Sequence, residues 1–206
     1  YLSGNVRQKL REAEAAAVDA PGYAPNVEAL RQAQPKDLDA SEIEVRLGAT
    51  WIDEWYIQQF MEQTFHPPYN RKNPIQVNYS PSTAEWNISG KSTPSKQDVN
   101  AYMTYGTERA NAYRILEDTL NLRDVRIYDT VYDADGTERR VLNSKETTLA
   151  QQKQQAIKDA FQEWIWRDPN RRQTLVQQYN ERFNSIRPRE YDGSHIVFSG
   201  MNPEIT

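Results

Sequence analysis

The chain has 206 residues, of which 37% are hydrophobic, and its mean hydropathy is -0.90. It carries 25 basic and 29 acidic side chains, which give a formal net charge of -4. The lack of cysteine excludes disulfides, zinc fingers and thiol catalysis. No apolar run approaches the roughly 20 residues of a membrane-spanning helix, and no segment has the pattern of a signal peptide. We therefore expect a cytoplasmic protein without a membrane partner.

The apolar content is low for a self-sufficient globule of this length, and the 12 tyrosines and 5 tryptophans supply much of it. The first residue is Tyr1 rather than methionine. Together these features favour a module that is part of a larger protein.

Charge is distributed unevenly along the chain. Residues 1–62 carry 11 acidic and 6 basic side chains, whereas residues 137–190 carry 7 acidic and 11 basic ones. Most of the later basic side chains are arginines, whose guanidinium group suits bidentate phosphate contacts. Two interpretations stay open at this point: a solvated helix face, or a surface that contacts a nucleic-acid backbone.

The first 40 residues predict a helical connecting arm. Residues 5–19 are rich in alanine and charge, with a narrow apolar stripe, and Pro21 and Pro25 interrupt the pattern. Asn26 is a suitable N-cap for a second short helix, which Pro35 ends. The weak apolar faces of both helices favour a connecting role over a core role.

The next segment predicts a strand, a helix and a hairpin. Ile43, Val45 and Leu47 alternate with charged residues, as in a short strand. Asp53 is an acceptable N-cap for a helix that runs to about residue 65. Residues 75–90 show two alternating apolar runs on either side of a turn at 80–83, which predicts a β-hairpin.

The second half predicts three helices and another hairpin. A helix is expected over 107–120, with an inward face of Ala110, Tyr113, Leu116 and Leu120. Residues 125–143 predict a hairpin because they contain an Asp-Gly turn at 135–136. A capping box at 143–146 opens a helix to about residue 166, and the Asp-Pro pair at 168–169 opens another. The expected fold class is α+β, mainly helical with two small antiparallel β-hairpins. The expected organisation is an arm over 1–40, an accessory domain over 41–186 and an irregular linker over 187–206.

Short motifs give little support for catalysis. His66-Pro67-Pro68-Tyr69 is similar to the Asp/Asn-Pro-Pro-aromatic loop of amino-group DNA methyltransferases. Its first residue is histidine, however, and it follows a helix pattern instead of a buried strand, so we favour a plain Pro-Pro turn. The sequence has no glycine-rich phosphate loop.

Two further patterns are better explained as turns. The group Asp133, Asp135 and Gly136 would place Val131 and Leu142 at the first and last ligand positions of a calcium loop, where neither can bind the ion. Ser, His and Asp occur together in residues 191–195, but they are too close in sequence for a catalytic triad. We therefore expect no catalytic residue, no metal and no cofactor within the chain.

The best candidate for a nucleic-acid surface is the arginine-rich region that follows Trp164. Trp164 and Trp166 are two residues apart on a predicted helix, so one is expected in the core and the other is available for a partner or a stacked base. The alternative is a purely structural role, in which both tryptophans are core aromatics beside a helix start with salt bridges. The candidate DNA contacts are Trp166, Arg167, Arg171, Arg172, Arg182, Arg187 and Arg189.

Four strings of the sequence carry a resemblance to a known group of proteins. They are YLSGNVRQKL at 1–10, VRLGATWI at 45–52, RILEDTLNLRDVRIYD at 114–129 and YNERFNSIRPREYDGSHIVFSGMNPEIT at 179–206. The chain resembles a segment of very large bacterial proteins of phages, plasmids and integrative elements. Those proteins join an adenine-specific DNA methyltransferase region to a Swi/Snf-type helicase motor.

The resemblance implies a position between the methyltransferase and the motor, with residues 187–206 leading toward the motor's first ATP-binding motifs. The parent protein would use S-adenosylmethionine and ATP with magnesium, although none of the family's catalytic motifs falls inside this chain. The expected partners are those neighbouring domains and double-stranded DNA. The expected function is a non-catalytic coupling domain that contacts the DNA backbone. The alternative is a protein–protein docking module without DNA contact, which uses aromatic residues such as Trp51, Trp55 or Trp166.

Overall fold

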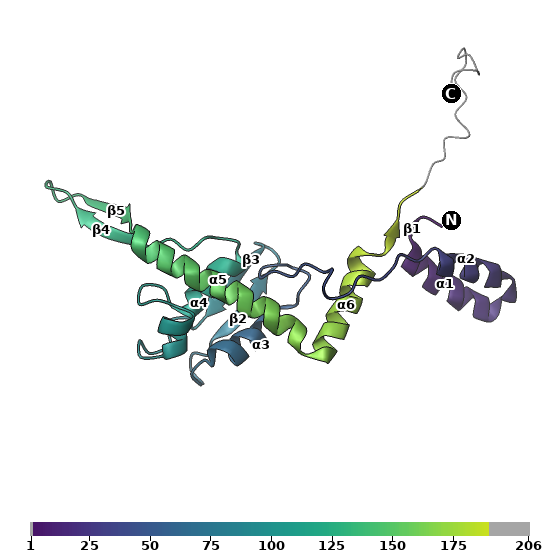
Figure 1. The fold of residues 1–206 in the computed structure, drawn as a ribbon, viewed down its shortest axis with the longest axis horizontal. Coiled ribbons are helices and arrows are strands. Elements are labelled where there is room, and N and C mark those ends of the chain that lie inside the picture. The colour runs from purple at the N-terminus through teal and green to yellow at the C-terminus, as the bar shows by residue number, and fades with distance from the viewer. Residues whose placement is uncertain (1, 190–206) are drawn as a thin grey trace, which may run out of the picture. The chain divides into compact units, whose positions relative to one another are not determined.

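The computed structural model describes residues 2–189, and these fall into two compact units (Figure 1). Among the described residues, the first unit combines 2–42 with 176–189, and the second unit is 43–175. The sequence predicted consecutive segments with boundaries at residues 40 and 186. It did not predict that the N-terminal segment and the end of α6 would belong to the same unit. The expected linker over 187–206 lies, from residue 190 on, outside the described residues.

The α+β class and the two hairpins expected from the sequence are confirmed. The helices are α1 (Val6–Asp19), η1 (Pro21–Tyr23), α2 (Ala24–Gln32), α3 (Glu54–Phe65), η2 (Asn100–Thr104), α4 (Ala112–Leu120), α5 (Ser144–Arg167) and α6 (Pro169–Phe183). The strands are β1 (Gly4–Asn5), β2 (Gln76–Ser80), β3 (Glu85–Ser89), β4 (Tyr128–Tyr132), β5 (Glu138–Leu142) and β6 (Ile186–Arg187). They form three antiparallel pairs, β1–β6, β2–β3 and β4–β5.

The first unit has a small core between α1 and α2. Ala13, Val27 and Leu30 form its centre, and Leu10 and Ala17 pack against them. Small alanine side chains on α1 let the two helices approach, but they bury little apolar surface. Polar contacts are therefore prominent in holding this unit together.

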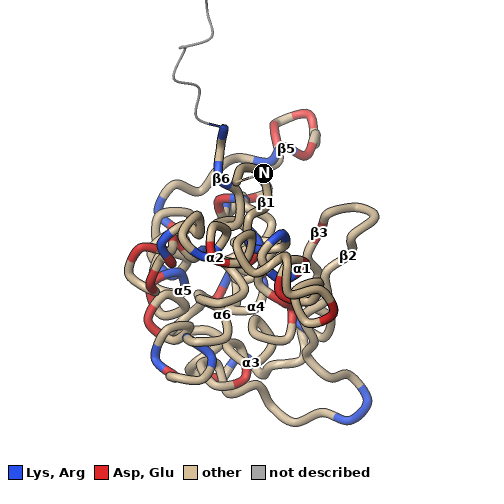
Figure 2. Tube along the Cα trace, turned by 90° about the vertical axis from the view of Figure 1, so that its right-hand side faces the viewer, with Lys and Arg blue, Asp and Glu red and all other residues tan. Residues whose placement is uncertain are grey.

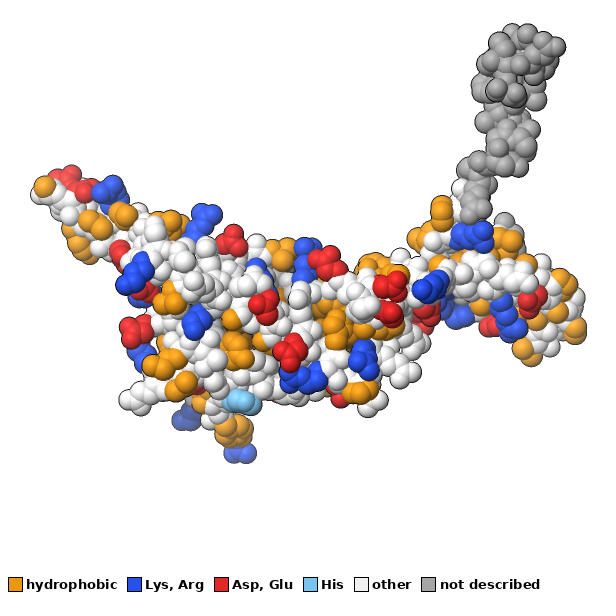
Figure 3. Space-filling view, in the orientation of Figure 1, with side chains coloured by type: hydrophobic (Ala, Val, Ile, Leu, Met, Phe, Trp, Pro, Cys, Tyr) orange, Lys and Arg blue, Asp and Glu red, His pale blue; other side chains and the backbone are white. Residues whose placement is uncertain are grey.

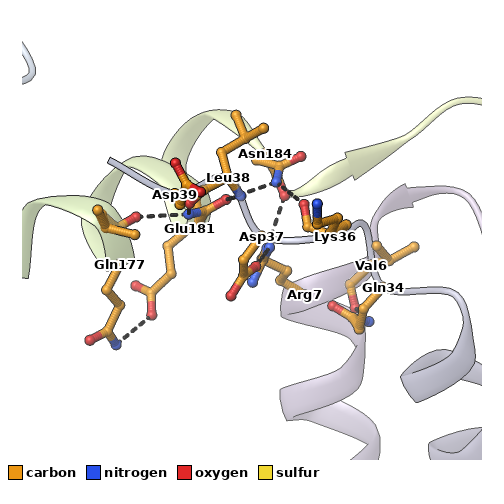
Figure 4. A network of polar contacts seen from close by, with 12 residues as sticks. Val6, Arg7, Gln34, Lys36, Asp37, Leu38, Asp39, Gln177, Glu181 and Asn184 are labelled. Carbon is orange, nitrogen blue, oxygen red and sulfur yellow. Dashed lines mark hydrogen bonds and ion pairs between the residues drawn. The ribbon is translucent and has the colours of Figure 1, made fainter. Parts of the chain in front are cut away.

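Those polar contacts fasten residues 36–38 to α6 (Figure 4). The Asn180 side chain is only 2% exposed, and its amide accepts from the Leu38 N–H at 2.9 Å and donates to the Leu38 carbonyl at 2.8 Å. Asn184 donates to the Lys36 carbonyl at 2.8 Å, and Arg7 donates to the Asn184 carbonyl at 2.9 Å. A side-chain amide thus pairs with a peptide group as a neighbouring strand would.

The core of the second unit is aromatic and lies between α3, α4 and α5. Phe60 lies edge-on to Phe161 with ring centroids 5.2 Å apart, and Phe65 lies edge-on to Tyr113 at 5.5 Å. Edge-to-face pairs of this kind add to the stabilisation from burial. The residues predicted to point inward are buried: Tyr113, Leu116 and Leu120 on α4, and Ala110 just before the helix begins.

The β2–β3 hairpin is covered along both edges by side chains from helices. Gln58 of α3 accepts from the Val77 N–H at 2.8 Å. On the other edge, Glu117 of α4 accepts from the Ile88 N–H at 2.7 Å, and Asn121 accepts from the Trp86 N–H at 2.9 Å. These acceptors satisfy strand N–H groups that would otherwise lie open at a sheet edge.

Two sequence expectations about local structure are wrong. Ile43, Val45 and Leu47 are buried but form no strand, because no neighbouring strand pairs with them and their alternation reflects burial alone. The helix expected from 107 begins at Ala112, because Asn111 caps it by accepting from the Arg114 N–H at 3.0 Å.

Candidate nucleic-acid interface

The corner between α5 and α6 holds most of the expected aromatic and arginine contacts. Trp164 is 5% exposed, and its indole N–H donates to Gln63 Oε1 at 2.8 Å. Trp166 is half-buried. The expectation that one of the two tryptophans belongs to the core is therefore confirmed.

Arg171 is a structural residue of this corner. Its Nε donates to the Ile165 carbonyl at 3.0 Å, and its Nη2 donates to the Trp164 carbonyl. The guanidinium carbon lies 3.6 Å from the centre of the Trp164 ring. Burial lowers the pKa of Arg171 below its usual range, with nearby Asp168 opposing that shift. The side chain thus satisfies carbonyls at the end of α5 that lack helical partners.

The neighbouring arginines are more available. Arg167 forms an ion pair with Glu163 at 2.5 Å, four residues earlier on the same helix. Arg172 is exposed, and within the described part of the chain its guanidinium has no ion-pair partner. Of the corner arginines, Arg172 is therefore the one whose charge is most open to a ligand.

The remaining expected contacts belong to the other unit. Arg182 lies over the Phe183 ring at 5.3 Å, Arg187 pairs with Gly4 between β6 and β1, and Arg189 is exposed. Each unit thus holds part of the predicted set, and the structure does not bring the seven residues together into one described site.

A second group of basic and aromatic residues lies on the loop between α3 and β2, residues 66–74, which we call the 66–74 loop. Tyr69 on this loop is 87% exposed. Arg71 and Lys72 are exposed, and among residues 2–189 neither side chain has an ion-pair or hydrogen-bond partner. The loop projects from the body of its unit with its Lys/Arg residues near the end (Figures 2 and 3). It contains no acidic residue.

The 66–74 loop begins at His66, where α3 ends. His66 ends α3 in the left-handed region, with φ 52°, and its N–H donates to the Glu62 carbonyl at 3.2 Å. The two prolines that follow cannot continue the helix. Further along, Asn70 Oδ1 accepts from the backbone N–H groups of Lys72 at 3.0 Å and Asn73 at 3.2 Å. This Asx turn fixes the backbone that carries the two cations.

The end of the loop is anchored to the chain that follows β3. Asn73 Nδ2 donates to Thr93 Oγ1 at 2.9 Å. Gly90 has φ 64°, and a Cβ there would lie 2.6 Å from the Pro74 carbonyl oxygen, so only glycine permits this approach. Residues 62, 66–71, 74 and 75 line an open hollow of about 510 Å³ beside the loop. The sequence interpretation treated 66–69 as a turn and did not consider Arg71 and Lys72, which follow it. These two adjacent cations were the feature of the sequence that could have indicated a binding loop.

The β4–β5 hairpin is the other exposed projection of this unit (Figure 1). Every residue from Thr130 to Leu142 is exposed, including Val131, Tyr132 and Val141. Its base is held by Asp129, which accepts from Arg109 at 2.8 Å and from Asn143 at 2.7 Å. These hydrogen bonds, the one from Arg109 foremost, lower the pKa of Asp129.

The hairpin turn accounts for the acidic residues that resembled a calcium loop. The Gly136 N–H donates to the Asp133 carbonyl at 2.9 Å, and Asp135 Oδ1 accepts from the Thr137 N–H at 3.0 Å. The turn interpretation is confirmed. Within residues 2–189, no three His, Asp or Glu side chains cluster as metal ligands would, and no helix combines the length and hydrophobicity needed to cross a bilayer. The motif at 191–195 lies outside the described residues.

Comparison with known proteins yields one family, described as a domain of unknown function, DUF8437, which matches residues 46–185. The match spans almost all of the second unit, including the 66–74 loop, the β4–β5 hairpin and the α5–α6 corner. No curated protein and no solved structure matches the chain. The chain thus belongs to the DUF8437 family.

Proposed function

We propose that this chain is a non-catalytic accessory domain of a larger cytoplasmic DNA-modifying protein, and that it contacts nucleic acid through the 66–74 loop. The observation that carries the contact is an exposed Tyr69 next to the unpaired cations Arg71 and Lys72 on an anchored loop. The resemblance to methyltransferase–helicase proteins supports the larger context. In that context the domain couples the two catalytic parts, and S-adenosylmethionine and ATP with magnesium belong to those parts.

The loop has the two chemical elements that non-specific binding to single strands requires. An aromatic face stacks on a base irrespective of sequence, and cations contact the phosphates on either side. The anchored base of the loop lowers the conformational entropy lost on binding. Since residues 43–175 carry 17 basic and 18 acidic side chains, attraction is local to the loop and long-range steering is weak.

The α5–α6 corner supplies a second set of candidate contacts. Arg172 and Trp166 are at least partly accessible, and Arg167 is held only by a surface ion pair. Contacts from such residues to phosphates would orient a strand without reading its sequence. Arg171 is left out of this proposal because its guanidinium is occupied by backbone carbonyls.

The experiment that tests the proposal measures binding of the full chain to a labelled single strand and to a random-sequence duplex, at about 50 and 200 mM salt. Tyr69→Ala and the double variant Arg71→Ala/Lys72→Ala are compared with a control, Arg126→Ala/Lys145→Ala, which removes the same charge elsewhere on the second unit. We expect the loop double variant to reduce the salt slope for single strands by about 0.7 per lost phosphate contact. If the control and the loop variants lose affinity equally, the loss comes from the change in net charge. That result would refute the proposal that the 66–74 loop contacts nucleic acid.

A second candidate function is protein docking, and the β4–β5 hairpin favours it. An isolated two-stranded hairpin is marginal in water, and this one exposes Val131, Tyr132 and Val141. Its open edges suit the addition of an extended strand from a neighbouring domain. Replacement of residues 130–141 by a short turn would abolish association with the adjoining helicase region if docking is its role. Unchanged association would exclude the hairpin as the contact.

A further inference from the structure

A second cleft in the 43–175 unit lies at the C-terminal end of α4, remote in sequence from the 66–74 loop. It has a volume of about 290 Å³ and lies between the 46–48 segment, the end of α4 and the middle of α5. The side chains that matter for its chemistry are Arg46, Leu47, Leu122, Arg123, Lys158 and Gln162. We call it the α4–α5 cleft. Its size is at the lower end for small-molecule sites.

Leu122 occupies a conformation that its side chain disfavours. The Arg123 N–H donates to the Asp118 carbonyl at 2.8 Å, and the Leu122 N–H donates to the Thr119 carbonyl at 3.0 Å. These two bonds form a Schellman motif, in which the left-handed residue is usually glycine. Leu122 has φ 56°, and its side chain is 65% exposed. The backbone conformation does not favour a leucine here, and the side chain lies beside Gly48 with most of its surface open at the cleft.

The opposite wall is brought in by Gly48. It has φ 87°, and a Cβ at this position would lie 2.3 Å from the Leu120 carbonyl oxygen and 3.3 Å from Leu122 Cδ2. Only glycine allows the chain to come this close to the end of α4. As a result Arg46, two residues earlier, lines the same cleft as Leu122.

Three of the ten lining residues are cations, Arg46, Arg123 and Lys158. Arg46 and Lys158 have no ion-pair partner among the described residues, and Arg123 has only a pair with Glu85 at 3.1 Å in which both side chains are largely exposed. Asp124 is the carboxylate in the lining. An arginine fork and a lysine ammonium both suit a phosphate group.

The inner part of the cleft is a fixed polar surface. Gln154 donates to the Arg123 carbonyl at 2.7 Å and to Thr119 Oγ1 at 3.2 Å, and it accepts from the Val125 N–H at 3.3 Å. Because these groups already satisfy one another, a ligand would be bound by the outer cations, the Gln162 amide and the Leu122 side chain.

We propose that the α4–α5 cleft binds a nucleotide unit, with its phosphate at Arg46 and Lys158 and its sugar or base against Leu122. A cleft that places cations beside the apolar side chain of Leu122 fits this combination of a phosphate and a flat apolar ring. The nucleotide can be free or belong to a single strand, and the test separates these sources. The inference does not depend on the 66–74 loop, which contributes no residue to this cleft.

The experiment is calorimetric titration of the full chain with ATP, with inorganic phosphate, with an oligothymidylate and with a glutamate-rich peptide. The variants are Arg46→Ala/Lys158→Ala and Leu122→Gly, with Arg126→Ala/Lys145→Ala as the control of equal charge. We expect the cleft double variant to weaken nucleotide binding at least tenfold and the control to leave it unchanged. Leu122→Gly is expected to weaken binding severalfold while its melting temperature is unchanged or higher. That combination separates a ligand contact from a folding defect.

Each result decides the question. Binding of ATP that the cleft variant loses supports a free nucleotide, and binding of the oligonucleotide alone with the same loss supports a strand. Oligonucleotide binding that is lost in the 66–74 loop variants but kept in the cleft variants overturns the cleft and leaves the proposed function intact. Binding of the acidic peptide alone, or of none of the four compounds at millimolar concentration, overturns the nucleotide site.

Discussion

The α5–α6 corner and the 66–74 loop each contain an arginine and an aromatic residue, yet the surroundings of the two arginines differ. At the corner, Arg171 lies over Trp164 and donates to two carbonyls at the end of a helix. On the loop, Arg71 follows Tyr69 by two residues, and neither side chain has a hydrogen-bond partner among residues 2–189. The difference shows that the unsatisfied groups around a cation determine its role. The end of α5 presents carbonyls that lack helical partners to Arg171, whereas the Arg71 side chain contacts no acceptor among residues 2–189.

The largest effect expected from this comparison is on stability at the corner. Arg171→Ala removes two charge-assisted hydrogen bonds and a cation–π contact, so we expect the free energy of unfolding to fall by about 2–3 kcal/mol. Arg172→Ala is the matched control and should change it by less than about 0.5 kcal/mol. Urea unfolding followed by tryptophan fluorescence measures both. Equal stability of the two variants would mean that Arg171 does not support the corner.

A next, intermediate effect concerns the anchor of the loop. Thr93→Val keeps the shape of the side chain but removes the hydroxyl that accepts from Asn73. We expect a loss of stability of about 1 kcal/mol and a severalfold loss of single-strand affinity, because the loop must then be ordered on binding. Binding and urea unfolding are measured on the same preparation. Lost stability with unchanged affinity would show that the anchor does not prepare the loop for its ligand.

The smallest effect belongs to the surface pair of the corner. Arg167→Ala removes an ion pair with Glu163 one helical turn away, and exposed pairs of this kind contribute about 0.3–0.5 kcal/mol. The change should vanish at high salt, whereas the effect of Arg171→Ala should persist. Unfolding curves at two salt concentrations check this. An Arg167→Ala effect as large and as salt-resistant as that of Arg171→Ala would remove the distinction between the two arginines.

Helix caps and tight turns were predicted correctly from the sequence, because each depends on a few neighbouring residues. The Asp53 and Asn143 caps both accept from the helical N–H groups expected of them, and the Asp-Gly pair lies in the turn of the β4–β5 hairpin. Such signals depend on residues within one turn of each other, so a sequence contains them whole. The buried alternation at Ile43, Val45 and Leu47 was misinterpreted because a strand needs a partner elsewhere in the chain.

The candidate sites depended on distant contacts, and the sequence predicted them poorly. Arg171 was grouped with its neighbours because nothing in the sequence shows that its guanidinium contacts the Trp164 and Ile165 carbonyls. The α4–α5 cleft combines residues near 46, 122 and 158, which only the fold brings together. The 66–74 loop was interpreted only as a turn, although Tyr69, Arg71 and Lys72 lie within four residues of one another in the sequence.

The exposure of the β4–β5 hairpin also makes it the natural place to insert foreign sequence. No residue from Thr130 to Leu142 contributes to the core, and the contacts of Asp129 hold the base of the ribbon independently of its end. Loop ends with small and polar residues tolerate insertion best. An epitope or a fluorescent probe placed between Asp135 and Gly136 should therefore leave the fold intact. Natural insertions at this point should also leave the stability of the fold unchanged. We therefore expect relatives of this domain to differ most in length at this hairpin.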